Sequence, residues 1–165
     1  MKKILLLAAF LITISASAQW RVTTPLGSTI FDITFTSDSV GYAISQSGFI
    51  GGCNQAHSML KTIDGGVNWV RLRAGITEEL NSIHFVDPLT GWIAADGSRL
   101  IKTEDGGMTW NLQTSGIGVG INDVYFIDEN RGFILGGNGL VMRSLNGGDT
   151  WHTISSGICS TLRRI

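Results

Sequence analysis

The sequence predicts an all-β protein, on the strength of its composition, its apolar patterning and an internal repeat. Of its 165 residues, 43% are hydrophobic, only 15% are charged and 22 are glycine. Low charge with abundant glycine is typical of short strands joined by tight turns, and the hydrophobic fraction argues against a disordered chain. No long segment has the 3.6-residue period of a helix, which argues against a parallel sheet with crossover helices. The net charge of −1 lacks the basic excess of a nucleic-acid-binding protein.

The first 18 residues have the organisation of an export signal. Lys2 and Lys3 precede an apolar run at 4–14, and Ala-Ser-Ala at 16–18 fits the small-x-small rule for cleavage. This run is far shorter than the ~20 residues that a membrane-spanning helix needs. We therefore expect cleavage before Gln19 and a bacterial protein that is exported, periplasmic or secreted, and not membrane-spanning once the signal is removed.

One segment recurs three times in the rest of the chain. Its final tryptophans, Trp69, Trp110 and Trp151, lie 41 residues apart and each follows an Asp-Gly-Gly or Asn-Gly-Gly turn. A second block, which ends in Gly-aromatic, precedes each segment at 33–42, 83–92 and 124–133. The first two copies of this block are 50 residues apart, so the first repeat carries about nine extra residues, placed at 47–58.

Each repeat predicts four short strands. In the third repeat, residues 123–127 alternate, 132–135 are apolar, 140–143 precede the Gly-Gly turn and 150–154 follow it. Glycine and asparagine tolerate the positive φ that tight hairpins require. Four strands in 40–45 residues is the spacing of a β-propeller blade. The sequence therefore predicts a β-propeller of four-stranded antiparallel blades, of which only about three are present, that is, a partial or open propeller.

The predicted organisation is a leading strand at 19–30, blade 1 at 31–73 with the insertion 47–58, blade 2 at 80–114, blade 3 at 121–156, and the stub of a fourth blade at 158–165. Leu162 aligns with Leu80 and Ile121 in this register. Because a propeller needs at least four blades to close, we expect a fragment, a truncated reading frame or one part of an assembly. Such an open stack exposes sheet faces that invite association.

The repeated Thr/Ser-x-Asp-Gly-Gly-x-x-Trp segment resembles the Asp-box, or BNR-type repeat, of sialidase-like propellers. Together with the Gly-aromatic block, it is most similar to secreted bacterial propellers grouped with photosystem II stability/assembly factors, over residues 20–157. The resemblance implies a non-catalytic module for protein binding or assembly, with no cofactor and no metal. The alternative is the N-terminal fragment of a secreted sialidase-like or other Asp-box-containing glycoside hydrolase.

The residues of the three boxes are expected to stabilise turns rather than to act in catalysis. The Asp or Asn accepts hydrogen bonds from turn N–H groups, the Thr or Ser adds a hydroxyl, and the Trp packs between blades. These structural positions are Thr62, Asp64, Gly65, Gly66 and Trp69; Thr103, Asp105, Gly106, Gly107 and Trp110; and Ser144, Asn146, Gly147, Gly148 and Trp151.

A candidate binding face lies opposite the boxes, where the loops between second and third strands and the blade-to-blade connections meet. Its candidate residues are Asn54, Gln55, His57, Arg73, Glu78, Asp96 and Arg99. The insertion is either a functional loop or a tolerated surface insertion. A protein partner is expected, with a glycan as the alternative. Glu78 and Glu79 are a poor catalytic pair, because neighbours on an extended segment point in opposite directions.

Two further features are open to more than one interpretation. Lys61, Lys102 and Arg143 stand immediately before the boxes and form either an anion-binding ladder or, as we favour, solvated strand ends. Cys53 and Cys159 are the only cysteines, and they pair only if the insertion reaches across the blades.

Overall fold

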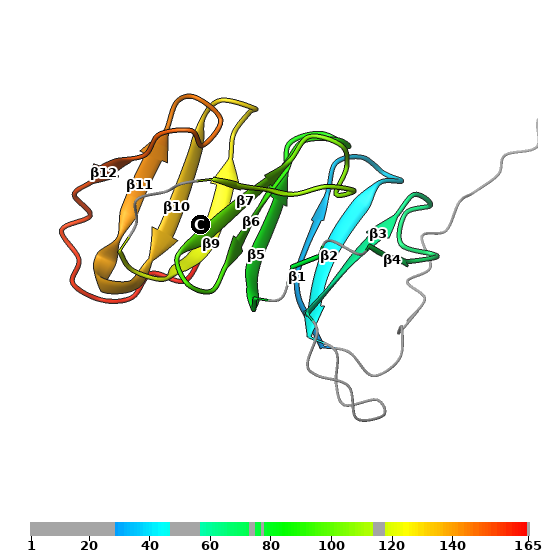
Figure 1. The fold of residues 1–165 in the computed structure, drawn as a ribbon, viewed down its shortest axis with the longest axis horizontal. Coiled ribbons are helices and arrows are strands. Elements are labelled where there is room, and N and C mark those ends of the chain that lie inside the picture. Colours follow the sequence, from blue (N-terminus) through cyan, green and yellow to red (C-terminus); the bar gives the residue numbers. More distant parts are fainter. Residues whose placement is uncertain (1–28, 47–56, 73–74, 77, 114–117, 165) are drawn as a thin grey trace, which may run out of the picture.

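The repeats of the sequence are realised as three separate four-stranded sheets. The structure is a computed structural model that describes residues 29–46, 57–72, 75–76, 78–113 and 118–164. In each sheet four consecutive strands pair antiparallel in sequence order. The prediction of an all-β fold with four-stranded antiparallel blades is therefore confirmed. Figure 1 shows the three blades side by side along the molecule.

The strands of the three blades follow the chain in order. Blade 1 holds β1 (Thr29–Phe35), β2 (Gly41–Gln46), β3 (His57–Thr62) and β4 (Val70–Leu72). Blade 2 holds β5 (Leu80–Phe85), β6 (Gly91–Ala95), β7 (Arg99–Thr103) and β8 (Asn111–Gln113). Blade 3 holds β9 (Ile121–Phe126), β10 (Gly132–Gly136), β11 (Val141–Ser144) and β12 (His152–Ile154), with a 3₁₀ turn at Gly137–Gly139.

Some strand limits differ from those expected. β3 begins at His57, inside the predicted insertion 47–58, because its ladder with β2 extends to the pair Gln46–His57. β12 starts two residues later than the expected strand at 150–154, since the box turn continues to Trp151. Residues 47–56 of the insertion and most of the predicted leading strand lie outside the described residues.

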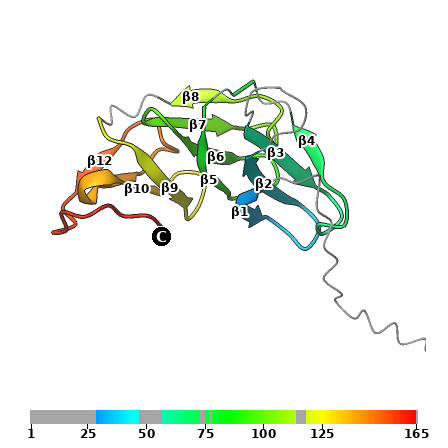
Figure 2. The ribbon, with the colours of Figure 1, turned by 90° about the horizontal axis from the view of Figure 1, so that it is seen from below.

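The first strands of the blades, β1, β5 and β9, lie next to one another along one side of the molecule (Figure 2). Because successive side chains of β6 point to opposite faces, blade 2 contributes to two cores. In β6, Ile93 and Ala95 face blade 1, whereas Trp92 and Ala94 face blade 3. The hydrophobic core therefore lies between blades rather than within a single sheet.

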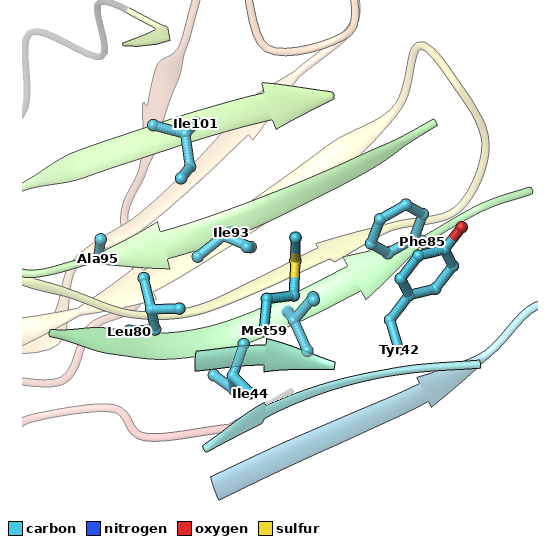
Figure 3. Packing of buried hydrophobic residues seen from close by; sticks show 9 residues of the cluster. Tyr42, Ile44, Met59, Leu80, Phe85, Ile93, Ala95 and Ile101 are labelled. Carbon is cyan, nitrogen blue, oxygen red and sulfur yellow. The ribbon is translucent and has the colours of Figure 1, made fainter. Parts of the chain in front are cut away.

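Each interface is centred on a stacked pair of aromatic rings. Tyr42 of blade 1 lies parallel to Phe85 of blade 2, with ring centroids 3.6 Å apart, and Figure 3 shows this pair beside Met59 in the same cluster. Trp92 stacks on Phe126 in the same way at 3.5 Å. The glycine before each aromatic is required by close approach, because a Cβ on Gly91 would lie 2.6 Å from the ring of Phe85.

Tyr42→Phe tests the polar part of this interface. The Tyr42 hydroxyl donates a 2.6 Å hydrogen bond to the carbonyl of Pro88 in the next blade, and the ring is fully buried. We expect the variant to lose about 1 kcal/mol of the free energy of unfolding in urea, the value of one such bond. Tyr125→Phe is the matched control, because Tyr125 is 41% exposed. Equal losses in the two variants would rule out this role for the Tyr42 hydroxyl.

Candidate functional site

The boxes form hydrogen-bonded turns on one face of the blades, which we call the box face. In the second box, Asp105 Oδ1 accepts from the backbone N–H of Thr109 at 2.9 Å, and Oδ2 accepts from the Thr109 hydroxyl at 2.6 Å. The Thr103 hydroxyl donates to Asp105 at 2.8 Å and accepts from the N–H of Gly107 at 2.9 Å. The indole of Trp110 donates to Gly107 O at 3.2 Å. The Asp105 carboxylate, the Thr103 hydroxyl and the Trp110 indole therefore order the turn together.

The same geometry recurs when the acid is replaced by an amide. In the third box, Asn146 Oδ1 accepts from the N–H of Thr150 at 3.0 Å, while Asn146 Nδ2 donates to the Thr150 hydroxyl at 2.9 Å. The two box glycines need positive φ, as at Gly147 (71°) and Gly148 (95°). Gly147 N also donates to Asn130 O at 2.9 Å, which joins the box to the turn between the first two strands.

Hydrogen bonding keeps the box carboxylates ionised. The side-chain bond from Thr109 is the largest of the contacts that lower the pKa of Asp105 to about 2. In the first box, the backbone N–H of Asn68 is the main cause of a lowered pKa for Asp64. These bonds act on the charged form, so protonation of either carboxylate weakens its turn.

The basic residues before the boxes belong to the blade interfaces. Lys61 Nζ donates to Gly106 O in the next blade at 3.3 Å and lies 5.0 Å from the centroid of the Tyr42 ring. Lys102 Nζ forms an ion pair with Glu104 at 2.8 Å and lies over the ring of Trp92. Our prediction of solvated strand ends is therefore wrong for these two lysines. The neighbouring second strand places an aromatic ring under each stem, and of the three basic residues only Arg143 is exposed.

Some of the candidate residues opposite the boxes form ion pairs or hydrogen bonds in the structure, and others lie outside its described part. Arg99 forms an ion pair with Glu78, and Asp96 accepts a 3.2 Å hydrogen bond from Asn81 Nδ2. These contacts join the β6–β7 turn to the start of β5. His57 is placed as the first residue of β3. Asn54, Gln55 and Arg73 lie outside the described residues, as does Cys53, whereas Cys159 is exposed.

A pocket that the sequence did not predict opens on this second face. In all three first strands the register shifts by one residue, at Phe31, Asn81 and Asn122. Such a bulge turns a side chain out of the ladder and is common next to binding sites. Together with Arg163, one repeat further on, these residues line a pocket of about 440 Å³, whose other lining residues are Glu79, Leu80, Thr161 and Arg164. We call it the bulge pocket.

A row of polar side chains follows the bulges, one residue later in each repeat. Ser82 Oγ lies 2.5 Å from Asp123 Oδ1 and 3.1 Å from Asp32 Oδ2. Arg164 Nη1 donates to Asp32 Oδ1 at 2.7 Å, and Nη2 donates to Phe31 O at 3.0 Å. The bond with Asp32 raises the pKa of the Arg164 guanidinium. This row ties the C-terminal segment to blade 1 and supports one side of the pocket.

The bulge pocket offers binding chemistry of mixed character. Phe31 and Leu80 are apolar, Asn81 and Asn122 carry amides, and Arg163 carries a positive charge. Among the residues described, no three His, Cys, Asp or Glu side chains are close enough to hold a metal ion. The pocket is suited to an extended chain that presents an apolar side chain and a hydrogen-bonding backbone.

One signal in the sequence could have led to these residues. Aligning the repeats on their Phe and Gly-aromatic blocks places Phe31, Asn81, Asn122 and Arg163 at one position. The residues there are Phe, Asn, Asn and Arg, whereas the position before it is always apolar. A variable position beside an invariably apolar one within a repeat is typical of a surface that has a purpose other than packing.

Comparison with known proteins identifies the repeat. The family model described as "Photosynthesis system II assembly factor YCF48" matches residues 12–115. A comparison with curated protein sequences gives no match. In the part of the chain that the structure describes, no helix has the length and apolar character to span a membrane.

Three solved structures share the fold. "YCF48 bound to D1 peptide" superposes with a TM-score of 0.69 and 20% identity over 84% of this chain and 44% of that one. YCF48 from Cyanidioschyzon merolae superposes with a TM-score of 0.64 and 22% identity, over 80% of this chain and 38% of that one. The Niastella koreensis GH74 enzyme superposes with a TM-score of 0.57 and 17% identity, over 77% of this chain and 22% of that one. At these identities the likeness shows the fold alone, and the chain spans less than half the length of each.

Substitutions at Asp105 test what the box acid contributes to stability. We expect Asp105→Ala to lower the melting temperature by roughly 2–6 °C, because it removes the acceptor for Thr109 N and for two hydroxyls. Asp105→Asn should stay close to the wild type at pH 7, since Asn146 orders the third box with the same acceptor atom. An Asp105→Ala protein with the wild-type melting temperature would contradict the turn-stabilising role.

The pH dependence of the melting temperature separates the contribution of the Asp105 charge from that of its hydrogen-bonding geometry. The pKa of Asp105 is lowered to about 2 in the folded protein, below the ~3.9 of an unfolded chain. Its stabilisation is therefore present above about pH 4 and is lost as the pH falls toward 2. Between pH 4 and pH 2, thermal melts should show a larger fall for the wild type than for Asp105→Asn. If the melting temperatures of the two proteins fall by the same amount, the charge of Asp105 contributes nothing to stability.

Proposed function

This chain belongs to the photosynthesis system II assembly factor YCF48 family, and on that premise we propose that it is an exported, non-catalytic propeller module that binds an extended segment of a partner protein. The family membership supports the module and its role in protein binding or assembly. The export signal that the sequence predicts in the first 18 residues supports a location outside the cytoplasm, periplasmic or secreted.

The observation that carries this proposal is the bulge pocket. Side chains from three blades and from the C-terminal segment converge on it, so it is built by the stacking of blades rather than by one mobile loop. An extended peptide can place one side chain against Phe31 and Leu80 while its backbone N–H groups face the amide oxygens of Asn81 and Asn122 and a backbone carbonyl faces Arg163. The solved structure of YCF48 with a D1 peptide supports a peptide as the class of ligand.

Three carboxylates near the pocket, those of Glu78, Asp32 and Asp123, favour binding over hydrolysis. Glu78 is paired with Arg99, and Asp32 is paired with Arg164. Asp123 accepts a hydrogen bond from the hydroxyl of Ser82. Hydrolysis of a glycosidic bond needs two carboxyl groups that face each other across an open site, one of them protonated. Carboxylates that are already hydrogen-bonded to cations or hydroxyls are poorly placed for that work.

Site-specific photo-crosslinking in cells tests this function. A benzophenone side chain replaces Phe31 at the pocket, and in a matched control it replaces Met108, which is 73% exposed on the box face. We expect one discrete protein adduct at position 31 and none at 108, with mass spectrometry placing the bond in a single partner segment. The same spectra should show an N-terminal peptide that begins at Gln19 if the signal is removed.

A charge reversal sharpens the result. Arg163→Glu should lower the yield of the crosslink at position 31 about tenfold, because the loss of one charge-assisted hydrogen bond weakens binding by about that factor. Arg131 is an exposed arginine on the box face that pairs with Asp128. The control variant Arg131→Glu should leave the yield of the crosslink unchanged. An adduct that forms equally well at positions 31 and 108, or that ignores Arg163→Glu, would refute binding at this pocket.

A further inference from the structure

The polar row beside the bulge pocket closes on itself. Ser82 lies between Asp32 of blade 1 and Asp123 of blade 3 and contacts both. The Arg164 guanidinium then returns to blade 1, where it donates to Asp32 Oδ1 and to Phe31 O. The four repeat positions of the row therefore surround a common centre instead of following a line. The residues one position earlier line the pocket in the same cyclic order, and we call them the rim: Phe31, Asn81, Asn122 and Arg163.

Asn81 offers the pocket a hydrogen-bond acceptor and no donor. Its Nδ2 donates to Ile121 O at 2.9 Å and to Asp96 Oδ1 at 3.2 Å, which uses both amide hydrogens. Because a carbonyl oxygen only accepts, the nitrogen must be the atom that faces Ile121, and this fixes the orientation of the amide. Within the described part of the chain, Asn81 Oδ1 accepts no hydrogen bond. This oxygen is therefore left to a ligand.

Asn122 repeats the arrangement in the next blade. Its Nδ2 donates to Leu162 O at 2.7 Å, so its Oδ1 again faces away from the neighbouring segment. Both asparagine side chains are half-buried. A half-buried acceptor without a hydrogen bond loses free energy relative to its hydrated form. Two adjacent amide oxygens of the rim are accordingly available to accept N–H groups.

The two asparagines lie between an apolar wall and a cation. On one side, Phe31 and Leu80 give the pocket its apolar surface, and Phe31 is 45% exposed. On the other side, Arg163 is exposed and forms no ion pair with any described residue. Its guanidinium only donates hydrogen bonds. Around the rim, the pocket therefore offers an apolar wall, an acceptor, a second acceptor and a donor.

A primary carboxamide presents the complementary groups in the same order around its own edge. The carbon stem is followed by the two hydrogens of the amide nitrogen and then by the carbonyl oxygen. We infer that the bulge pocket binds the side-chain carboxamide of a glutamine or asparagine in the partner segment. The two N–H groups bond Asn81 and Asn122, the carbonyl accepts from Arg163, and the stem packs on Phe31. This inference rests on the proposed peptide binding and names the residue that anchors the peptide.

Other polar groups satisfy the rim less well. A backbone amide has one N–H, so two peptide units would be needed for the two asparagines. A carboxylate has no N–H and would place its charge against two amide oxygens, whereas an ammonium would face the Arg163 guanidinium. The remaining charges of the lining favour a neutral group, because Arg164 is paired with Asp32 and the Glu79 carboxylate offsets Arg163.

Capped amino acids test the inference on the intact protein. The probes are the N-acetyl N-methylamides of glutamine, asparagine, glutamate and methionine, which share one backbone and differ in the side chain. In NMR spectra of isotopically labelled protein, the carboxamide probes should shift the side-chain amide signals of Asn81 and Asn122 in a saturable way, with dissociation constants in the millimolar range. The glutamate and methionine probes should bind at least about tenfold more weakly, since their side chains lack N–H donors.

Variants of the rim separate its two kinds of contact. Arg163→Met removes the donor for the carbonyl oxygen and should weaken binding of the glutamine probe about tenfold. Arg131→Met on the box face is its control and should leave binding unchanged. Asn122→Leu removes one acceptor and should have an effect of similar size, with the exposed Asn130→Leu as its control. If thermal melts show that Asn122→Leu is unfolded, Arg163→Met decides, because Arg163 forms no ion pair within the described chain.

Three results would overturn the inference. Equal binding of all four probes would mean that the pocket recognises the backbone, and the absence of a saturable shift with either carboxamide probe would mean that it does not take this group. Full binding by Arg163→Met would remove the expected carbonyl contact. Crosslinking at position 31 is measured separately. An adduct there without a preference for carboxamides contradicts only this inference, whereas loss of the adduct contradicts the proposed peptide binding even if the carboxamide probes bind.

Discussion

The stack of one aromatic ring on a phenylalanine of the next blade is the contact on which the rest of the structure depends. It lies at the centre of each core and determines how closely successive blades approach. A glycine must precede the first ring, because the Phe of the same blade packs over it. The box tryptophan then closes the cluster edge-on, as Trp110 does against Phe85. The strand glycine, the box tryptophan and the buried core residues of each interface thus all pack around one pair of stacked rings.

The site is a consequence of that spacing. When blades approach this closely, the first strands lie near enough for Ser82 to bond both Asp32 and Asp123. The bulges beside this row turn Phe31, Asn81 and Asn122 toward a common pocket. The proposed binding site therefore lies at irregularities of the innermost strands, whereas the boxes on the opposite face form hydrogen-bonded turns.

The features that could be predicted from the sequence are those encoded locally. The Gly-Gly turns and the 41-residue period specify hairpins and blades, because turn chemistry needs few neighbours. The bulge pocket could not be predicted in this way, since one additional residue in a strand hardly changes its alternation. Lys61 and Lys102 were misjudged for a related reason. Their surroundings come from an adjacent strand and from the following blade, so an isolated repeat gives no indication that their stems are covered. The contacts of Glu78, Asp96 and Arg99 could not be predicted either, because they form where the β6–β7 turn meets the segment that leads into β5.

The central claim is that paired rings hold the blades together beyond the area they bury. A double-mutant cycle on Trp92 and Phe126, with each replaced by Leu singly and together, measures that contribution in urea unfolding. We expect a coupling free energy of about 0.5–1.5 kcal/mol between the two positions. If the effects of the two substitutions are additive within about 0.3 kcal/mol, the stack is no more than ordinary apolar contact, and this account of the fold is wrong.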